Sequence, residues 1–287
     1  MMQTSFHNLR NLASLSAYFQ VESDEPNACS IQRDEFETVC CKLNLIKDDK
    51  LLDVGCELVI FAAENRGTHV TGITVDKPLH MKLNQHIAAT SLRGSVVKLM
   101  DYRNLVGVKF GKAVCLDPFA TVRRKETEVL LGTIYNLLHP GGLFLVECIT
   151  GMPSTSSTTA KRLERLTRRF DHILNHSSQN GFLPSDVVER IIRQIGFEIQ
   201  QVEELNERYR LRLKQWLTCL QANQDDIMRD RGEACFHDWN SELSILLHHI
   251  EVSDVKCCQW LLSKSINSRQ HVIIPDSQRC CGSRNPD

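Results

Sequence analysis

The sequence predicts an α/β protein with a doubly wound, mostly parallel sheet. Between Lys50 and Thr150, five short runs rich in apolar and β-branched residues alternate with amphipathic segments, which is typical of parallel strands joined by helices. The chain has 287 residues, of which 42% are hydrophobic, enough to bury the core of one large α/β domain. Ligands of such sheets bind at the carboxyl ends of the strands, so we look for site residues there.

The first half of the chain supplies the five strands. Residues 1–47 are expected to be mainly helical, with a polar break over 21–30. Gly67 follows an apolar helical segment and is expected to end it as a C-cap. The expected strands are 50–56, 69–75, 95–105 with its exit loop, 112–119 and 142–150, and the helices between them are 57–67, 81–92 and 125–142.

Beyond Gly151 the pattern changes. A Ser/Thr-rich loop leads into a charged helix that ends near residue 177. The remaining expected elements are a helix over 183–196, a sixth strand over 197–205, and helices over 209–224 and 242–264. Residues 265–287 contain turn residues without a period, which predicts a disordered tail.

Composition restricts the function. The net charge of −1 gives no electrostatic case for nucleic acid. No apolar stretch reaches the roughly 20 residues of a transmembrane helix, and the N-terminus lacks the apolar core of a signal peptide. None of the twelve cysteines has C-x-x-C spacing, so no metal site is expected. We therefore expect free thiols in a reducing compartment and a cytoplasmic protein.

Separated segments then match one family in order. They include "LLDVGC", "DYRNL", "LLHPGGLFLVECITG", "GFLPS", "YRLRLKQW" and "CQWLLSK". Together they resemble the cyclopropane fatty acid and mycolic acid cyclopropane synthases over residues 14–264. The resemblance implies a class I methyltransferase that uses S-adenosylmethionine, with a seven-stranded Rossmann-like sheet. It also implies three parts: a helical segment over 1–47, a methyltransferase-like domain over 48–264 with a cap over 152–180, and the tail over 265–287.

The cofactor loop departs from the family pattern. The family's first strand ends in D-x-G-C-G-W-G, whereas this chain lacks the GWG triplet and reads Glu57 directly after Cys56. Two consequences stay open, because Glu57 would repel the cofactor's carboxylate but attract its sulfonium and amino group. By resemblance, the cofactor-binding residues are Asp53, Gly55, Cys56, Thr74, Asp76, Asp101 and Tyr102. The alternative for Asp76 is a solvated acid in a turn, and the alternative for Tyr102 is a half-buried tyrosine of the core.

The catalytic pocket departs from the pattern too. In the family, a bound bicarbonate removes the proton and is held by four polar residues. At these positions the present chain has Ser16, Ala120, Glu147 and Tyr209, and only the tyrosine matches. We therefore do not expect bicarbonate. Tyr209 and Glu147 are the catalytic candidates, with Glu147 as a general base or, alternatively, as a structural residue at a strand end.

These departures leave three interpretations. One is a divergent methyltransferase acting on a lipid-like or small apolar metabolite, with at most transient membrane contact through residues 152–180. Another is a catalytically inactive pseudo-methyltransferase that serves as a binding or partner module. The last is an error in the gene model that removed the triplet and added the cysteine-rich tail. The oligomeric state does not follow from the sequence.

Overall fold

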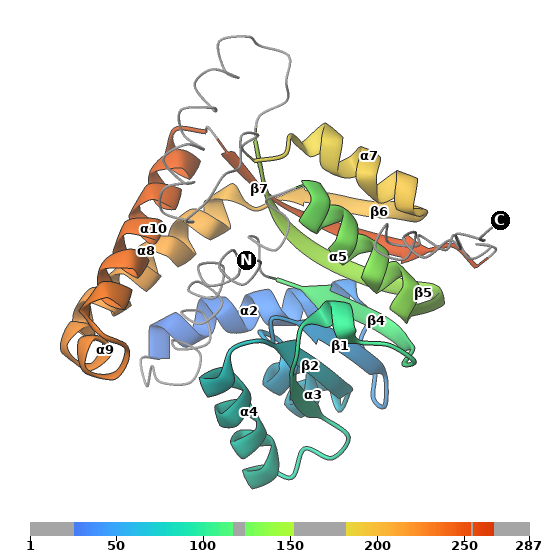
Figure 1. Cartoon of the computed structure of the whole chain (residues 1–287), viewed down its shortest axis with the longest axis horizontal. Coiled ribbons are helices and arrows are strands. Elements are labelled where there is room, and N and C mark those ends of the chain that lie inside the picture. Colours follow the sequence, from blue (N-terminus) through green and yellow to red (C-terminus); the bar gives the residue numbers. More distant parts are fainter. Residues whose placement is uncertain (1–25, 117–123, 152–181, 254, 267–287) are drawn as a thin grey trace, which may run out of the picture.

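One seven-stranded sheet forms the centre of the fold (Figure 1). The computed structural model describes residues 26–116, 124–151, 182–253 and 255–266, with side chains from Arg33 onward. The strand order is β3-β2-β1-β4-β5-β7-β6. All neighbours are parallel except β7, which is antiparallel to both β5 and β6. The strands are β1 (Lys50–Val54), β2 (His69–Thr74), β3 (Val96–Leu99), β4 (Phe110–Cys115), β5 (Leu138–Gly151), β6 (Phe197–Glu204) and β7 (Val255–Lys264).

The predicted doubly wound sheet is confirmed, but the helix expected over 242–264 is wrong. Its second part is strand β7, which lies between β5 and β6. Most β7 residues are buried, because helices cover both faces of the sheet at this position. Burial on both faces removes the alternation of apolar and polar residues by which a strand is recognised.

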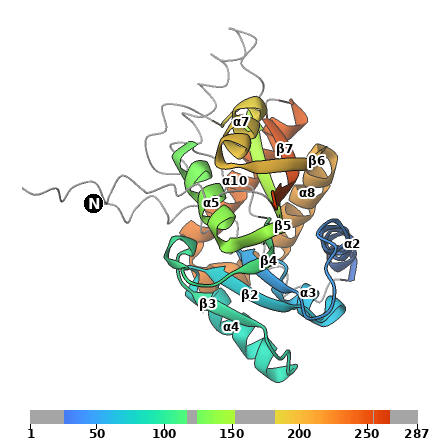
Figure 2. The same cartoon turned by 90° about the vertical axis from the view of Figure 1, so that its right-hand side faces the viewer.

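Helices cover both faces of the sheet (Figure 2). On one face, α5 (Arg124–Leu137) and α7 (Ser185–Ile195) enclose a core that contains Phe144, Val146 and Trp260. On the other face, α2 (Pro26–Lys42), α3 (Val59–Arg66) and α4 (Lys77–Ala89) enclose Leu51 and Leu145. The helices α8 (Asn206–Ala222), α9 (Gln224–Arg231) and α10 (Glu233–Glu251) form a third apolar cluster beside the end of β5 and the start of β7.

Several helix boundaries differ from the expected ones for local reasons. α4 begins four residues earlier than predicted, because Asp76 accepts a hydrogen bond from Leu79 N at 2.8 Å and Pro78 occupies the first turn. α2 already begins at Pro26, inside the expected polar break. α5 ends at Leu137 rather than at residue 142. The Lys264 ammonium donates to the carbonyls of Tyr135 and Leu138 at that end, where a helix favours a cation.

Some of the remaining predictions fall within the described residues, and others lie outside them. Gly67 ends α3 in a left-handed conformation, as predicted. The described cysteines are free thiols, and no cluster of metal-ligating residues occurs in the described ranges. Every described helix is too short or too polar to cross a bilayer. The expected cap over 152–180, the tail from 267 onward, Ser16 and Ala120 lie outside the described residues.

Candidate functional site

The loop after β1 folds back so that its backbone N–H groups contact Asp53 of that strand. Gly55 and Cys56 have positive φ values of 109° and 68°, which reverse the chain directly after β1. The Asp53 carboxylate accepts a hydrogen bond from Leu58 N at 2.7 Å. Burial raises the pKa of Asp53 to about 7, although hydrogen bonds from backbone N–H groups of the loop act in the opposite direction. The backbone N–H groups of this loop therefore face Asp53.

The shortened loop also packs directly on β2. At Gly72 a Cβ atom would lie 2.7 Å from Val59 Cγ2 and 2.8 Å from Cys56 Sγ. Only glycine leaves room for these two side chains. Glu57 is buried next to them, and its charge acts on Arg212 of α8. The loop thus packs onto the sheet and carries a buried carboxylate.

The predicted cofactor residues after β2 and β3 make local contacts. Thr74 accepts a hydrogen bond from Asp76 N at 3.1 Å, and Asp76 caps α4. Asp101 accepts hydrogen bonds from Arg103 N at 2.9 Å and from Arg103 Nε at 2.8 Å. Burial alone would raise the pKa of Asp101, but these hydrogen bonds outweigh it and lower the pKa. All three residues lie at the carboxyl edge of the sheet, where a doubly wound fold binds its ligand.

Tyr102 belongs to the same edge. It begins the short helix η1 (Tyr102–Asn104) and packs, half-buried, against the core under α5. Burial, followed by the nearby Asp101 charge, raises its pKa. The ring therefore has the core contact that the sequence offered as the alternative to stacking on a ligand.

A buried carboxylate, Glu147, is the centre of the candidate site. Its side chain is on β5, and only 3% of the residue is exposed. One carboxylate oxygen accepts a hydrogen bond from the Tyr209 hydroxyl of α8. The other accepts one from Gln259 Nε2 at 2.7 Å, because Gln259 is the cross-strand partner of Glu147 in the β5–β7 ladder. The structure thus joins the two residues that the sequence offered as catalytic candidates.

This carboxylate lies at the same edge of the sheet as the cofactor candidates. In the β4–β5 ladder, Cys115 at the end of β4 pairs with Val146, so Glu147 comes one residue beyond that end. Burial raises the pKa of Tyr209, and the Glu147 carboxylate raises it further. The phenol therefore stays protonated at neutral pH and acts as a donor.

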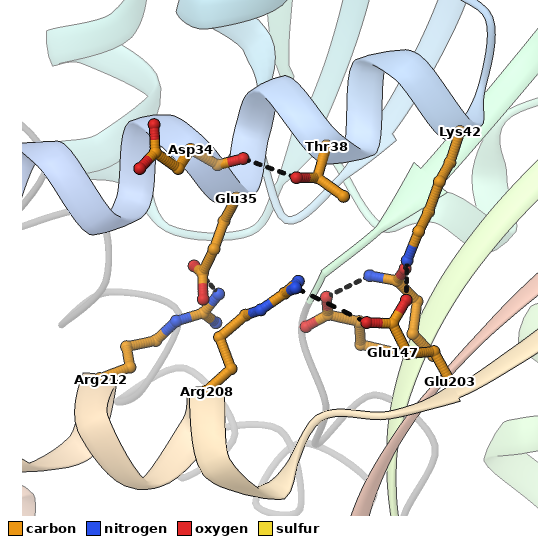
Figure 3. A network of polar contacts seen from close by, with 9 residues as sticks. Asp34, Glu35, Thr38, Lys42, Glu147, Glu203, Arg208 and Arg212 are labelled. Carbon is orange, nitrogen blue, oxygen red and sulfur yellow. Dashed lines mark hydrogen bonds and ion pairs between the residues drawn. The ribbon is translucent and has the colours of Figure 1, made fainter.

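Charged residues lie around Glu147 (Figure 3). The Arg212 guanidinium lies 4.7 Å from the centroid of the Tyr209 ring and forms an ion pair with Glu35 of α2. Burial raises the pKa of Glu35, whereas the Arg212 charge lowers it. Lys42, at the end of α2, contacts both Glu203 of β6 and the amide oxygen of Gln259.

Sequence reasoning missed five residues of this arrangement: Glu35, Lys42, Glu203, Arg212 and Gln259. Glu35 and Lys42 share helix α2, but the residues that they contact come more than 150 positions later in the chain, so no local spacing relates the set. Gln259 alone carried a signal, since it is a polar residue within the apolar run "CCQWLL". A polar group inside a buried strand requires a hydrogen-bond partner, and Glu147 is that partner.

The arrangement can accept a proton. Both carboxylate oxygens of Glu147 accept hydrogen bonds, and each oxygen has further acceptor capacity. Hydrogen bonds to the charged form stabilise a carboxylate. Thr74, Asp76 and Asp101 lie along the neighbouring strand ends with polar side chains, and Tyr102 adds a half-buried ring.

Comparison with known proteins identifies relatives over most of the chain. The family model described as mycolic acid cyclopropane synthetase matches residues 11–260. A "Sphingolipid C9-methyltransferase" of Komagataella phaffii is 24% identical over 83% of this chain and 50% of its own length. A "Probable fatty acid methyltransferase" of Pseudomonas putida is 28% identical over 72% of this chain and 52% of its own length. The chain thus spans about half the length of these curated relatives.

Solved structures show the same fold. The cyclopropane synthase MmaA2 from Mycobacterium tuberculosis superposes with a TM-score of 0.71 at 18% identity, covering 86% of this chain and 88% of that one. The mycolic acid cyclopropane synthase CmaA1, complexed with SAH and CTAB, superposes with a TM-score of 0.68 at 22% identity, covering 80% and 83%. The expected class I methyltransferase fold is therefore confirmed.

Proposed function

Because the chain belongs to the mycolic acid cyclopropane synthetase family, we propose that it transfers a methyl group from S-adenosylmethionine to an unsaturated carbon of a lipid chain. The observation that carries this proposal is the buried Glu147, held by Tyr209 and Gln259 at the carboxyl edge of the sheet. The names of the curated relatives support a lipid acceptor. These relatives are named as methyltransferases, so the comparisons give no support to the non-catalytic alternative.

The residues of the carboxyl edge fit part of the cofactor. Asp76 and Thr74 offer oxygen atoms suited to ribose hydroxyls, and Asp101 with Tyr102 offers a carboxylate and a ring suited to a nucleoside. The loop does not offer a backbone cradle for a carboxylate, because its N–H groups face Asp53. Glu57 instead adds a negative charge, which suits the positively charged sulfonium and amino group. Bound S-adenosylmethionine would supply an electrophilic methyl group.

A residue of this chain would accept the proton that the reaction releases. The electron pair of the acceptor double bond would form the new carbon–carbon bond as the methyl–sulfur bond breaks, and a carbon next to the resulting cationic centre would then lose a proton. Glu147 accepts that proton as general base. The resemblance puts Glu147 at a histidine position of the family's bicarbonate site, so a carboxylate of the chain would take the place of the bound anion. Tyr209 and Gln259 hold this carboxylate in one orientation.

Two measurements test the proposal. Calorimetric titration of the purified protein with S-adenosylmethionine should give a micromolar dissociation constant, about −8 kcal/mol. Transfer of a labelled methyl group to vesicles containing unsaturated fatty acyl lipids or to unsaturated sphingolipids should then fall about 10²–10⁴-fold in Glu147→Gln. The affinity of this variant for the cofactor should stay within twofold of the wild type.

The control is Glu198→Gln, which removes an exposed carboxylate from β6 and should leave transfer unchanged. Cooperative thermal unfolding without cofactor binding at millimolar concentration would overturn the proposal. Undiminished methyl transfer by Glu147→Gln would overturn the role of Glu147.

A further inference from the structure

A row of polar side chains crosses three neighbouring strands on one face of the sheet. Glu147 of β5 is the cross-strand partner of Gln259 of β7, and Gln259 is in turn the partner of Glu203 of β6. Lys42 extends from the last turn of α2 onto this row (Figure 3). Only 13% of the Lys42 side chain is exposed, and its ammonium contacts Glu203 and the amide oxygen of Gln259.

The chemistry of an ammonium group fixes which way the Gln259 amide points. An ammonium has three donors and no acceptor, so the amide atom that faces Lys42 must be the oxygen. The NH₂ group then faces Glu147, where Nε2 donates to a carboxylate oxygen at 2.7 Å. The reversed amide would put its NH₂ against the ammonium and its oxygen against the carboxylate. Both contacts of the reversed amide are repulsive, and Gln259 is only 3% exposed, so water does not relieve them.

The geometry points to Lys42 as a positioning residue for the proton acceptor. By holding the amide oxygen of Gln259, Lys42 keeps the Nε2 donor on Glu147 and so fixes the orientation of the Glu147 carboxylate. Glu203 balances the Lys42 charge and itself lies 3.6 Å from Arg208. The catalytic consequence rests on the proposed function, whereas the orientation of the amide does not.

Other ionisable groups face Glu147 from the surrounding elements, and all of them stay in place when Lys42 is changed. They are Glu35 of α2, Tyr209 and Arg212 of α8, and Cys257 of β7. Substitution of Lys42 by Met removes one positive charge and the contact to Gln259, while these other groups are retained.

The first experiment observes the amide directly and does not depend on activity. In protein labelled with [¹⁵N]glutamine, the Gln259 NH₂ pair is assigned by its absence in Gln259→Met. In Lys42→Met we expect both proton shifts to move and hydrogen exchange of the pair to accelerate at least tenfold. Lys42→Arg should retain the wild-type behaviour, because a guanidinium also has donors only.

The control for this experiment is Lys112→Met. Lys112 is equally covered, with 14% of its side chain exposed, and it pairs with Asp49 at 2.7 Å, away from Glu147. This variant should leave the Gln259 pair unchanged. Wild-type shifts and exchange in Lys42→Met would overturn the assigned orientation.

The second experiment measures methyl transfer. In Lys42→Met we expect kcat to fall roughly 10–100-fold, as for other losses of a supporting contact, with an unchanged KM for S-adenosylmethionine. Lys42→Arg should retain the wild-type kcat, because a guanidinium also has donors only. A wild type that binds no cofactor would overturn the proposed function and leave the amide result standing. A Lys42→Met variant with the wild-type kcat would overturn the positioning role alone.

Discussion

The substitution Gly72→Ala tests whether the shortened cofactor loop is closed onto the sheet. A Cβ atom at this position of β2 would lie 2.7 Å from Val59 Cγ2, 2.8 Å from Cys56 Sγ and 3.1 Å from Val97 Cγ2. Real Cβ atoms essentially never approach other heavy atoms to less than 3.0 Å. Val59 and Cys56 are both buried, so their side chains cannot move aside without displacing the loop.

The expected cost follows from this crowding. Inserting one methyl group into a packed core typically destabilises a protein by about 1–3 kcal/mol. For a chain of this size, each kcal/mol lowers Tm by about 2–4 °C. Differential scanning calorimetry of Gly72→Ala at fixed pH and scan rate should show a loss in this range. The double variant Gly72→Ala/Val59→Ala, which removes the closest contact, should lose less than the sum of the two single variants.

Gly111→Ala is the matched control. Gly111 lies on β4, and a Cβ atom there meets no atom within 4 Å. Its Tm should change little. Equal Tm values for Gly72→Ala and Gly111→Ala would refute the reasoning, because the loop would then leave open the space above β2 that a longer cofactor loop needs.

Three further substitutions test the charges of the site and of the helical cluster. Arg212→Met leaves Glu35 buried without its partner and should lower the free energy of unfolding in urea by about 3–5 kcal/mol. A double variant with Glu35→Met should recover part of this free energy, and full additivity of the two losses would contradict the pairing. The Glu242 carboxylate of α10 is buried and has no hydrogen bond among the described residues, and burial raises its pKa to about 8, with a smaller contribution from Asp238. Its stabilising contribution is complete below pH 4.5 and is lost as the pH rises through 8. Glu242→Gln should therefore flatten the decline in Tm between pH 5 and pH 9, and parallel curves of Tm against pH for the wild type and the variant would contradict this reasoning. Glu57→Gln should weaken the binding of S-adenosylmethionine about tenfold, or 1.4 kcal/mol, and should weaken the binding of its uncharged thioether product less. Tighter binding of S-adenosylmethionine would instead indicate that Glu57 repels the cofactor's carboxylate.

The sequence was sufficient to predict most of the sheet because helices and strands alternate along it. The first six strands were expected near their observed positions, since each carries a period or is bounded by turn residues. β7 was missed, because a strand that is buried on both faces and follows a long helix resembles the continuation of that helix. The start of α4 was also missed, because Asp76 was interpreted as a ligand-binding acid while its carboxylate caps the helix.

The candidate site was predictable only in part. Glu147 and Tyr209 were found by resemblance to a family motif, and the structure brings them into contact. Glu35 and Lys42 were not found, because they reach the site from the helix before β1 and their partners lie more than 150 residues later in the chain. Such pairings depend on tertiary packing and leave no local pattern. The roles of Asp53, Gly55, Cys56, Thr74, Asp76, Asp101 and Tyr102 toward the cofactor stay predictions.

The antiparallel strand β7 has a consequence for how the chain reaches its folded form during synthesis. β7 is inserted between β5 and β6, so β6 has no strand to pair with until residues 255–264 have left the ribosome. The same strand carries Gln259 to Glu147 and Lys264 to the end of α5. A nascent chain interrupted before Val255 would expose the unpaired edge of β5 to aggregation. It would also lack Gln259, the hydrogen-bond partner of Glu147, so a partly synthesised product would acquire neither the complete sheet nor the buried polar network.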